Sequence, residues 1–369
     1  MSGSRAFWVT AAVFSAQLCD EMWYNPNMMK KKKAGSGGLY FYAVLITFIS
    51  VILLFVSLFF AFRGKDEKVE KDEKEEEVEE TIEAAPDEGD LFRSKLKEMA
   101  QSGYSMLQIL KSFFPDDIVL TDEGRFWFFD VDDSLKKNSL KEEGFIRNDD
   151  GTVDYVENGV SKGKKGIDIS KYNGEVDWEQ VYASGVRFAY IRAGVRGYAS
   201  GAIVKDDFFD DNITNAAAAG LETGTYFFSQ AVDEEEARKE ADFVLECVKD
   251  KKISCPIAYD LEKIENYDSP PRTKDLSKEQ MTKNAIAFCE RIKEAGYTPI
   301  IYGNIKTFMM LTELSELEGY QKWFADYISD DDHLPYYPYE MSLWQYSEKG
   351  SVPGVEGNCD LNIGFFEGE

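Results

Sequence analysis

The longest apolar run in the sequence is Leu39–Phe62, whose 24 residues include no charged side chain. At 1.5 Å per residue, a helix of this length crosses a hydrocarbon core of roughly 30 Å. A buried core helix is a poor alternative because helices of soluble proteins are seldom apolar on every face. A cleaved signal peptide would have a shorter apolar run, followed by a cleavage site of small residues. The pattern therefore predicts one transmembrane helix over 39–62.

Charged residues flank this predicted helix on both sides. Four lysines precede it at 30–33, and five cations follow it between 63 and 74, so counting cations does not decide the orientation. Residues 65–90 carry 4 Lys against 14 Asp and Glu, a composition that cannot bury a core. We expect residues 1–38 to form an N-terminal segment and 63–90 to form an acidic linker or stalk.

Residues 91–164 alternate apolar and polar positions with two different periods. Helical spacing covers 91–100 and 105–114. The segments 118–131 and 144–156 are typical of two β-hairpins, with turns at Asp122-Glu123-Gly124 and at Asn148-Asp149-Asp150-Gly151. These patterns predict a small α+β domain close to the membrane, in which we find no catalytic cluster.

From Lys165 to Glu369, short apolar segments alternate at first with long amphipathic ones, which predicts an α/β fold with a parallel sheet. The helical patterns stop after about the fifth strand, while strand patterns continue. This predicts a TIM-type barrel whose last strands lack helices. The predicted strands are GIDIS, FAYIRAG, ETGTYFFS, PIAYDLE, TPIIYG, KWFADY and SLWQYS.

Composition narrows the chemistry. The formal net charge of −26 argues against a nucleic-acid binder, which needs clustered cations. His333 is the single histidine, so triads and metal sites that need several histidines are excluded. No cysteine pair has CxxC spacing, and the four cysteines from Cys247 onward could form disulfides or remain free thiols. Acid–base chemistry in this chain would belong to carboxylates.

Acidic residues recur where the predicted strands end: Asp168, Asp260, Glu262 and Asp326. In a parallel barrel these ends surround one mouth, where the active site of such folds lies. Asp260 and Glu262 are two residues apart and would face the same side of a strand. Repulsion between two close carboxylates raises one pKa and leaves an acid beside a base, as glycoside hydrolysis requires. The alternative is that an acidic protein simply has carboxylates at many positions.

Aromatic residues accompany these acids near the strand ends. Tyr226, Tyr302 and Trp344 are the candidates for stacking on sugar rings. Ordinary core packing is the alternative for each of them, because 14% of the chain is aromatic.

Eight ordered segments resemble glycoside hydrolase family 25, the Chalaropsis-type lysozymes. They are GIDISKYNGEVDW, FAYIRAG, AAGLETGTYFFS, PIAYDLE, YTPIIYGN, WFADY, LWQYS and CDLN, and they cover residues 165–369. The resemblance implies a modified barrel of five βα units followed by three strands. It also implies hydrolysis of the β-1,4 bond after N-acetylmuramic acid in peptidoglycan.

The resemblance also implies a role for each matching acid. Glu262 matches the family's general acid/base, and Asp260 matches the partner that orients the 2-acetamido group of the substrate. Asp168 and Asp360 match substrate-site aspartates, whereas Asp326 matches no position with a family role. Help from the acetamido group leads us to expect net retention at the anomeric carbon.

We therefore expect a membrane-anchored lysozyme that binds peptidoglycan glycan strands and needs no cofactor or metal. Peptidoglycan lies outside the cytoplasmic membrane, so residues 1–38 would be cytoplasmic and residues 65–369 would face the wall of a bacterium of Gram-positive type. The alternatives are a non-catalytic glycan-binding ectodomain that tethers the membrane to the wall, and another barrel glycosidase such as a chitinase-like enzyme. The sequence leaves the oligomeric state open.

Overall fold

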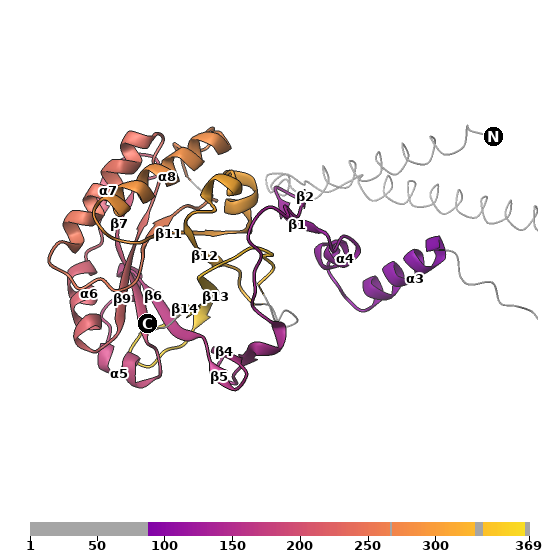
Figure 1. Ribbon diagram of the computed structural model, residues 1–369, viewed down its shortest axis with the longest axis horizontal. Coiled ribbons are helices and arrows are strands. Elements are labelled where there is room, and N and C mark those ends of the chain that lie inside the picture. The colour runs from indigo at the N-terminus through magenta and orange to yellow at the C-terminus, as the bar shows by residue number, and fades with distance from the viewer. Residues whose placement is uncertain (1–87, 266–267, 329–334, 366–369) are drawn as a thin grey trace, which may run out of the picture. The chain divides into compact units, whose positions relative to one another are not determined.

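The computed structural model describes residues 88–265, 268–328 and 335–365 (Figure 1). They belong to a compact unit, Ala85–Glu369. The predicted segment 1–38, the transmembrane helix 39–62 and nearly all of the linker 63–90 lie outside the described residues. Within the three described ranges, no helix has both the length and the apolar character needed to cross a membrane.

Eight strands form a closed barrel, because β6 pairs with both β7 and β14. A short strand, β8 (Ile203–Lys205), extends β7 as a hairpin outside the ring. The ring consists of β6 (Lys164–Ile169), β7 (Phe188–Arg196), β9 (Glu222–Phe228), β10 (Ile257–Asp260), β11 (Pro299–Asn304), β12 (Gln321–Ala325), β13 (Leu343–Gly350) and β14 (Cys359–Gly364). The predicted barrel is confirmed.

The last strand of the barrel, β14, runs antiparallel to both of its neighbours. A parallel β13–β14 pair would need a crossover of about a dozen residues or more. Only residues 351–358 separate the two strands, so the chain reverses instead. The alternation of strands and helices did not predict this reversal.

Helices cover the outside of the barrel (Figure 1). The first four are α5 (Trp178–Ala183), α6 (Phe209–Ala218), α7 (Glu234–Val248) and α8 (Lys278–Glu294). Carboxylate or hydroxyl caps begin α5, α7 and α8. After β11 the connection contains only a π-helical turn, Thr307–Leu311, and a 3₁₀ turn, Leu314–Leu317. The long helices therefore end with the fourth strand of the barrel rather than the fifth.

The residues of each strand alternate between the barrel interior and the layer beneath the helices. Tyr190 packs inside with Trp323, whereas its neighbour Ile191 belongs to the outer layer. Gly166 has no side chain because a Cβ there would lie 2.1 Å from the ring of Phe188. The four cysteines among the described residues are free thiols. This resolves the alternative left open by their even number.

The N-terminal elements confirm the two predicted helices and both hairpins. They are α3 (Glu88–Gln101), α4 (Met106–Phe113), β1 (Asp117–Asp122), β2 (Arg125–Asp130), η2 (Glu142–Gly144), β3 (Phe145–Arg147), β4 (Val153–Glu157) and β5 (Val160–Ser161). Glu123 and Gly124 both have positive φ, as a two-residue hairpin turn of type I′ requires.

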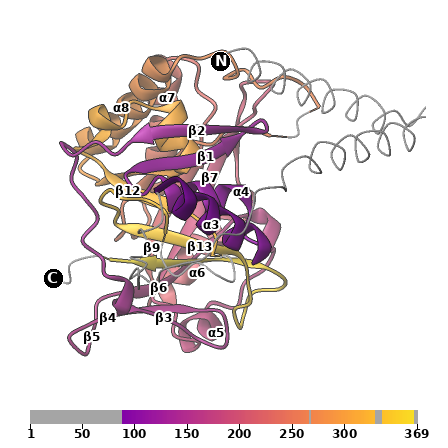
Figure 2. The same cartoon turned by 90° about the vertical axis from the view of Figure 1, so that its right-hand side faces the viewer.

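These N-terminal elements contact the barrel at separate places (Figure 2). The Tyr336 hydroxyl accepts from Val119 N and donates to Asp117 O, both at 2.9 Å, which fixes β1. The Phe145 ring on β3 lies 5.5 Å from the ring of Trp344. Both the β1–β2 hairpin and the β3–β5 sheet thus pack on the barrel strands or their connections.

Candidate active site

Four carboxyl groups meet at one end of the barrel. Asp168 lies near the end of β6, Asp260 ends β10, and Glu262 follows two residues later. Asp360 lies at the start of β14, and the β6–β14 register pairs it directly with Asp168. Because β14 is antiparallel, its first residues reach the mouth to which the parallel strands bring their last residues.

Asp168 and Asp360 form the first coupled pair. Burial raises the pKa of Asp168, while hydrogen bonds from neighbouring side chains partly offset this effect. Burial also raises the pKa of Asp360, and the negative charge of Asp168 raises it further, to about 8. At neutral pH, Asp360 therefore holds a proton and donates it to Asp168 in a hydrogen bond.

Two side-chain amides hold the β6 aspartate. Gln345 Nε2 and Asn362 Nδ2 each donate to its Oδ2 atom at 2.8 Å. The orientation of each amide is fixed in turn, because Tyr302 and Tyr327 donate to Gln345 Oε1 and the Trp323 indole donates to Asn362 Oδ1. This network favours a carboxylate rather than a carboxylic acid at Asp168.

Asp260 and Glu262 form the second coupled pair. The pKa of Asp260 is well above its usual range, first because the side chain is 4% exposed and then because Glu262 is negatively charged. Burial also raises the pKa of Glu262, but the hydrogen bond from Asp260 lowers it. The pair therefore shares a proton that rests on Asp260. The Asp260 Oδ1 atom has no hydrogen-bond partner among the described residues.

One cation, Arg192 on β7, influences these acids from nearby. Its guanidinium lies 2.7–2.8 Å from Asp206 Oδ2, so most of its charge is balanced there. It still lowers the pKa of Asp260 and that of Tyr226, although burial raises the Tyr226 pKa overall. Tyr226 is half-buried and interacts electrostatically with Asp168, so it belongs to the same cluster.

The structure separates two predicted site residues from this cluster. Trp344 is 1% exposed and packs outside the barrel on Phe145, so its ring is not available to a sugar. Successive residues of a strand face opposite sides of the sheet. Gln345, which follows Trp344 on β13, is therefore the residue that faces the barrel interior and contacts Asp168. Asp326 Oδ2 accepts from the backbone N–H of Tyr336 at 2.7 Å and so anchors a loop. These placements correct the assignment of Trp344 and Asp326 as substrate contacts.

Sequence reasoning missed Arg192, Gln345 and Asn362, although all three lie inside the quoted segments FAYIRAG, LWQYS and CDLN. The available signal was the two-residue period. Asn362 follows Asp360 by two positions and shares its face of β14, just as Glu262 was paired with Asp260. Applying the same rule along each motif would have placed these polar residues at the mouth.

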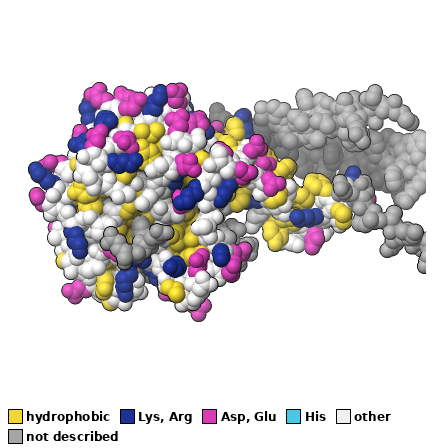
Figure 3. All heavy atoms as spheres, in the orientation of Figure 1, with side chains coloured by type: hydrophobic (Ala, Val, Ile, Leu, Met, Phe, Trp, Pro, Cys, Tyr) yellow, Lys and Arg dark blue, Asp and Glu magenta, His cyan; other side chains and the backbone are white. Residues whose placement is uncertain are grey.

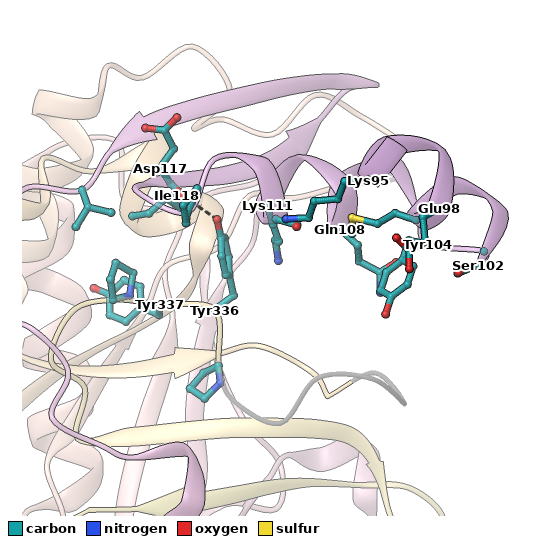
Figure 4. Close-up of a pocket in the computed structure, with 17 residues that line it drawn as sticks. Lys95, Glu98, Ser102, Tyr104, Gln108, Lys111, Asp117, Ile118, Tyr336 and Tyr337 are labelled. Carbon is teal, nitrogen blue, oxygen red and sulfur yellow. Dashed lines mark hydrogen bonds between the residues drawn. The ribbon is translucent and has the colours of Figure 1, made fainter. Parts of the chain in front are cut away.

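The cavities beside the N-terminal elements include two at the β1–β2 hairpin and the helices before it. A chamber of about 860 Å³ adjoins Glu262 and the tip of the β1–β2 hairpin. Another, of about 1210 Å³, lies between α3, α4 and residues 335–338, where Figure 4 shows the bonded Tyr336 side chain at its edge. None of the four mouth acids lines the second cavity. Within the described ranges, no group of three or more His, Cys, Asp or Glu side chains could hold a metal ion.

Comparison with known proteins places these residues in a family context. The sequence model of the family "Glycosyl hydrolases family 25" matches residues 167–355, which excludes the N-terminal elements α3 to β5. The autolytic lysozyme of Clostridium acetobutylicum is 28% identical over 200 residues, covering 54% of this chain and 55% of that protein. Lysozyme M1 of Streptomyces globisporus is 29% identical over 209 residues, covering 55% and 68% of the two chains.

The chain thus spans about half the length of the clostridial relative that it matches. Among solved structures, the bacterial lysozyme from Streptomyces coelicolor is 29% identical, with a TM-score of 0.45. That comparison covers 54% of this chain and 91% of the other.

Proposed function

Since the chain belongs to glycosyl hydrolases family 25, we propose that it is a lysozyme. Its reaction would be cleavage of the β-1,4 bond between N-acetylmuramic acid and N-acetylglucosamine in peptidoglycan. The observation that carries the proposal is the hydrogen-bonded Asp260–Glu262 pair, whose pKa values are both raised at the mouth of the barrel. Two carboxyl groups that share one proton supply an acid and a base at neutral pH.

In this proposal Glu262 protonates the oxygen of the leaving sugar and later accepts a proton from the attacking water. The proton that rests on Asp260 in the free protein is available to Glu262 through their hydrogen bond. Asp260, once ionised, orients the acetamido group of the substrate, whose carbonyl oxygen attacks the anomeric carbon. Two displacements at that carbon give net retention, and NMR observation of the inverted anomer as first product would contradict this step.

Asp168 binds the substrate as a carboxylate held by the two amides. A hydrogen bond from a sugar N–H or O–H to this carboxylate is charge-assisted and stronger than one between neutral groups. Asp360, protonated at neutral pH, is paired with Asp168 in the β6–β14 register and adds a neutral carboxyl group beside it. The two pairs thus divide the work, with Asp260–Glu262 acting on the bond and Asp168–Asp360 holding the sugar.

We place the enzyme in the cell membrane of a Gram-positive type of bacterium, anchored by one helix over 39–62. The support is the uncharged 24-residue run and the extracytoplasmic location of the substrate. Residues 1–38 are then cytoplasmic and the barrel faces the wall. Detergent should be required to extract the full-length chain from membranes, and release by a salt wash alone would contradict the anchor.

The enzymatic proposal is tested by release of reducing ends from purified peptidoglycan by the detergent-solubilised full-length chain. Glu262→Gln removes the proposed acid and should lower kcat by about 10²–10⁴-fold. Glu179→Gln is the control, because Glu179 is exposed on α5 and does not line the chamber beside Glu262. Muramic acid should appear at the new reducing ends. A wild-type chain that sediments with peptidoglycan without cleaving it would favour the non-catalytic tether.

A further inference from the structure

The β1–β2 hairpin forms a wall beside the proposed catalytic acid, although it lies outside the residues that match the family. The chamber of about 860 Å³ lies between this hairpin, the loop after β10, and residues that follow β11. Its lining from the hairpin is Thr121–Gly124 and Phe126, and Glu262 borders the chamber from the barrel. The chamber is therefore a direct extension of the catalytic mouth.

Asp122 holds the hairpin tip in place. Its carboxylate lies 2.8 Å from Lys263 Nζ and 3.1 Å from Lys306 Nζ, and its side chain is 10% exposed. The hydrogen bond from Lys263 is the main reason that the pKa of Asp122 lies below its usual value. The ion pairs of Asp122 with Lys263 and Lys306 form a hairpin clamp. Because Lys263 follows Glu262 directly in the chain, this clamp fixes the position of the hairpin relative to the proposed catalytic acid.

The chamber offers an apolar floor and a cation. Pro271, Met281 and Leu311 line it, and the ring of Phe126, 41% exposed, forms part of the wall. Lys263 and Lys306 are balanced by acids, whereas exposed Lys274 has no ion-pair partner among the described residues. A ligand with small apolar groups and a free carboxylate fits this lining.

Sugar hydroxyls fit it less well, because several polar side chains of the lining already have partners. The Thr273 hydroxyl donates to Gln230 Oε1 at 3.0 Å, and both Asp122 oxygens accept from lysines. The lining thus favours a peptide with small side chains over another glycan unit.

A peptide of this kind is part of the proposed substrate. In muramic acid the stem peptide is attached through a lactyl ether to ring carbon C3, two carbons from the C1 atom whose bond Glu262 would cleave. We propose that the chamber between the β1–β2 hairpin and the loop after β10 binds the stem peptide of peptidoglycan. In it, Phe126 packs on the small side chains and Lys274 pairs with a stem carboxylate. This inference rests on the proposed lysozyme function.

The test compares two substrates with the full-length chain in detergent: peptidoglycan that carries its stems, and glycan strands from which an amidase has removed them. The readout is the ratio of kcat/KM for the two substrates. Phe126→Ala should lower the preference for stem-bearing substrate about 5- to 10-fold. Lys274→Ala should lower it about 2- to 3-fold at low salt and less at high salt, since an exposed ion pair is screened.

Trp127→Ala is the matched control. Trp127 is 42% exposed on the same strand, but it faces the other side of the hairpin and does not line the chamber. Its substitution should leave the ratio unchanged. Thermal unfolding of each variant checks that the hairpin remains folded.

Each remaining outcome has a distinct meaning. A Phe126→Ala variant that loses activity equally on both substrates would overturn the inference in favour of a glycan-binding wall. Unchanged ratios for both variants would also overturn it, as would a Trp127→Ala effect as large as that of Phe126→Ala. A wild-type chain that cleaves neither substrate would instead refute the proposed function itself, so the two failures are distinguishable.

Discussion

Acidic side chains at the same end of the barrel have pKa values that are shifted in opposite directions. Asp122 on the hairpin contacts two lysines, and its pKa is lowered. Asp260, Glu262 and Asp360 contact other acids, and their pKa values are raised. The difference in pKa depends on which acid each cationic side chain contacts, rather than on how many cations lie at this end of the molecule.

Consecutive residues show this most directly. Glu262 and Lys263 are adjacent in the chain, yet the lysine ammonium pairs with Asp122 rather than with the glutamate beside it. Arg192, whose charge lowers the pKa of Asp260, is likewise bound by Asp206. Lys263 and Arg192 are thus paired with acids other than those at the mouth. A lysine placed beside the mouth acids would lower their pKa values and displace their protons.

The largest effect on activity is expected from removing the carboxyl group of Asp260, which shares a proton with Glu262. Asp260→Asn leaves Glu262 without the carboxyl group that holds its proton and, in the proposed reaction, without the group that orients the acetamide. We expect kcat on peptidoglycan to fall about 10²–10³-fold. The pH profile of kcat should change from that of a coupled pair to that of a single glutamate.

Asp326→Asn serves as the control for this variant, because Asp326 also follows a barrel strand but binds a backbone N–H. Its kcat should remain within a few-fold of wild type. Equal losses in the two variants, at matched thermal stability, would mean that the coupling of Asp260 with Glu262 has no special role.

The proton shared by Asp168 and Asp360 should show in the pH dependence of stability. Asp360 has a pKa of about 8 in the folded chain against an ordinary 3.8, so the folded state binds more protons between these values. Its contribution to stability is complete below pH 3.8 and is lost as the pH rises toward 8. The free energy of unfolding should fall with a slope of up to about 1.4 kcal/mol per pH unit.

Asp360→Asn removes this titration and should flatten the slope, making the variant more stable than wild type at pH 8 but not at pH 4. Urea unfolding at several pH values measures it. A residual slope of the same sign is expected from the other buried acids whose pKa values are raised, which are Asp168, Asp260, Glu262 and Glu240. A variant that is less stable than wild type at pH 8 would contradict the shared proton.

A smaller effect should follow from loosening the network around the β6 aspartate. Gln345→Met keeps the side-chain volume but removes one of the two amide donors. We expect the free energy of unfolding to fall by about 1–3 kcal/mol, because a buried carboxylate loses a hydrogen bond. Gln180→Met, on the exposed surface of α5, should change it by less than about 0.5 kcal/mol. Similar values for the two variants would mean that the network adds little.

The smallest effect is expected at the hairpin clamp. Asp122→Asn removes two ion pairs whose lysines are partly exposed, so the loss of stability should be about 0.5–1 kcal/mol. High salt should reduce the difference between the variant and wild type. Asp133→Asn, which breaks an ion pair at a 95% exposed aspartate, should have no measurable effect. An Asp122→Asn variant that matches Asp133→Asn at low salt would show that these ion pairs do not hold the hairpin in place.

Sequence patterns predicted the elements of the fold well because those elements depend on local periodicity. The β1–β2 hairpin follows from a turn with Gly124 between two apolar runs, and seven of the eight barrel strands follow from short apolar segments. The direction of β14 was missed because it depends on the length of a connection rather than on an apolar pattern.

The candidate site was likewise predicted only in part. The acids at strand ends were predicted because their position depends on where each strand stops. The side that Trp344 faces depends on the register of β13 in the closed barrel. The sequence does not indicate this side, because apolar residues lie on both faces of the strand. The partner of Lys263 could not be predicted at all, because Asp122 lies 141 residues away in the sequence.

The barrel and its acid cluster are complete only after the antiparallel strand β14 has been synthesised. It closes the barrel against β6 and brings Asp360 and Asn362 to the mouth, with Asn362 separated from Asp168 by 194 residues. During translation the ring therefore stays open until this segment emerges, and a contact of such long sequence separation forms late. A chain that stops before Cys359 would have two unpaired barrel edges and an incomplete acid cluster. Such a chain would thus lack part of the proposed active site.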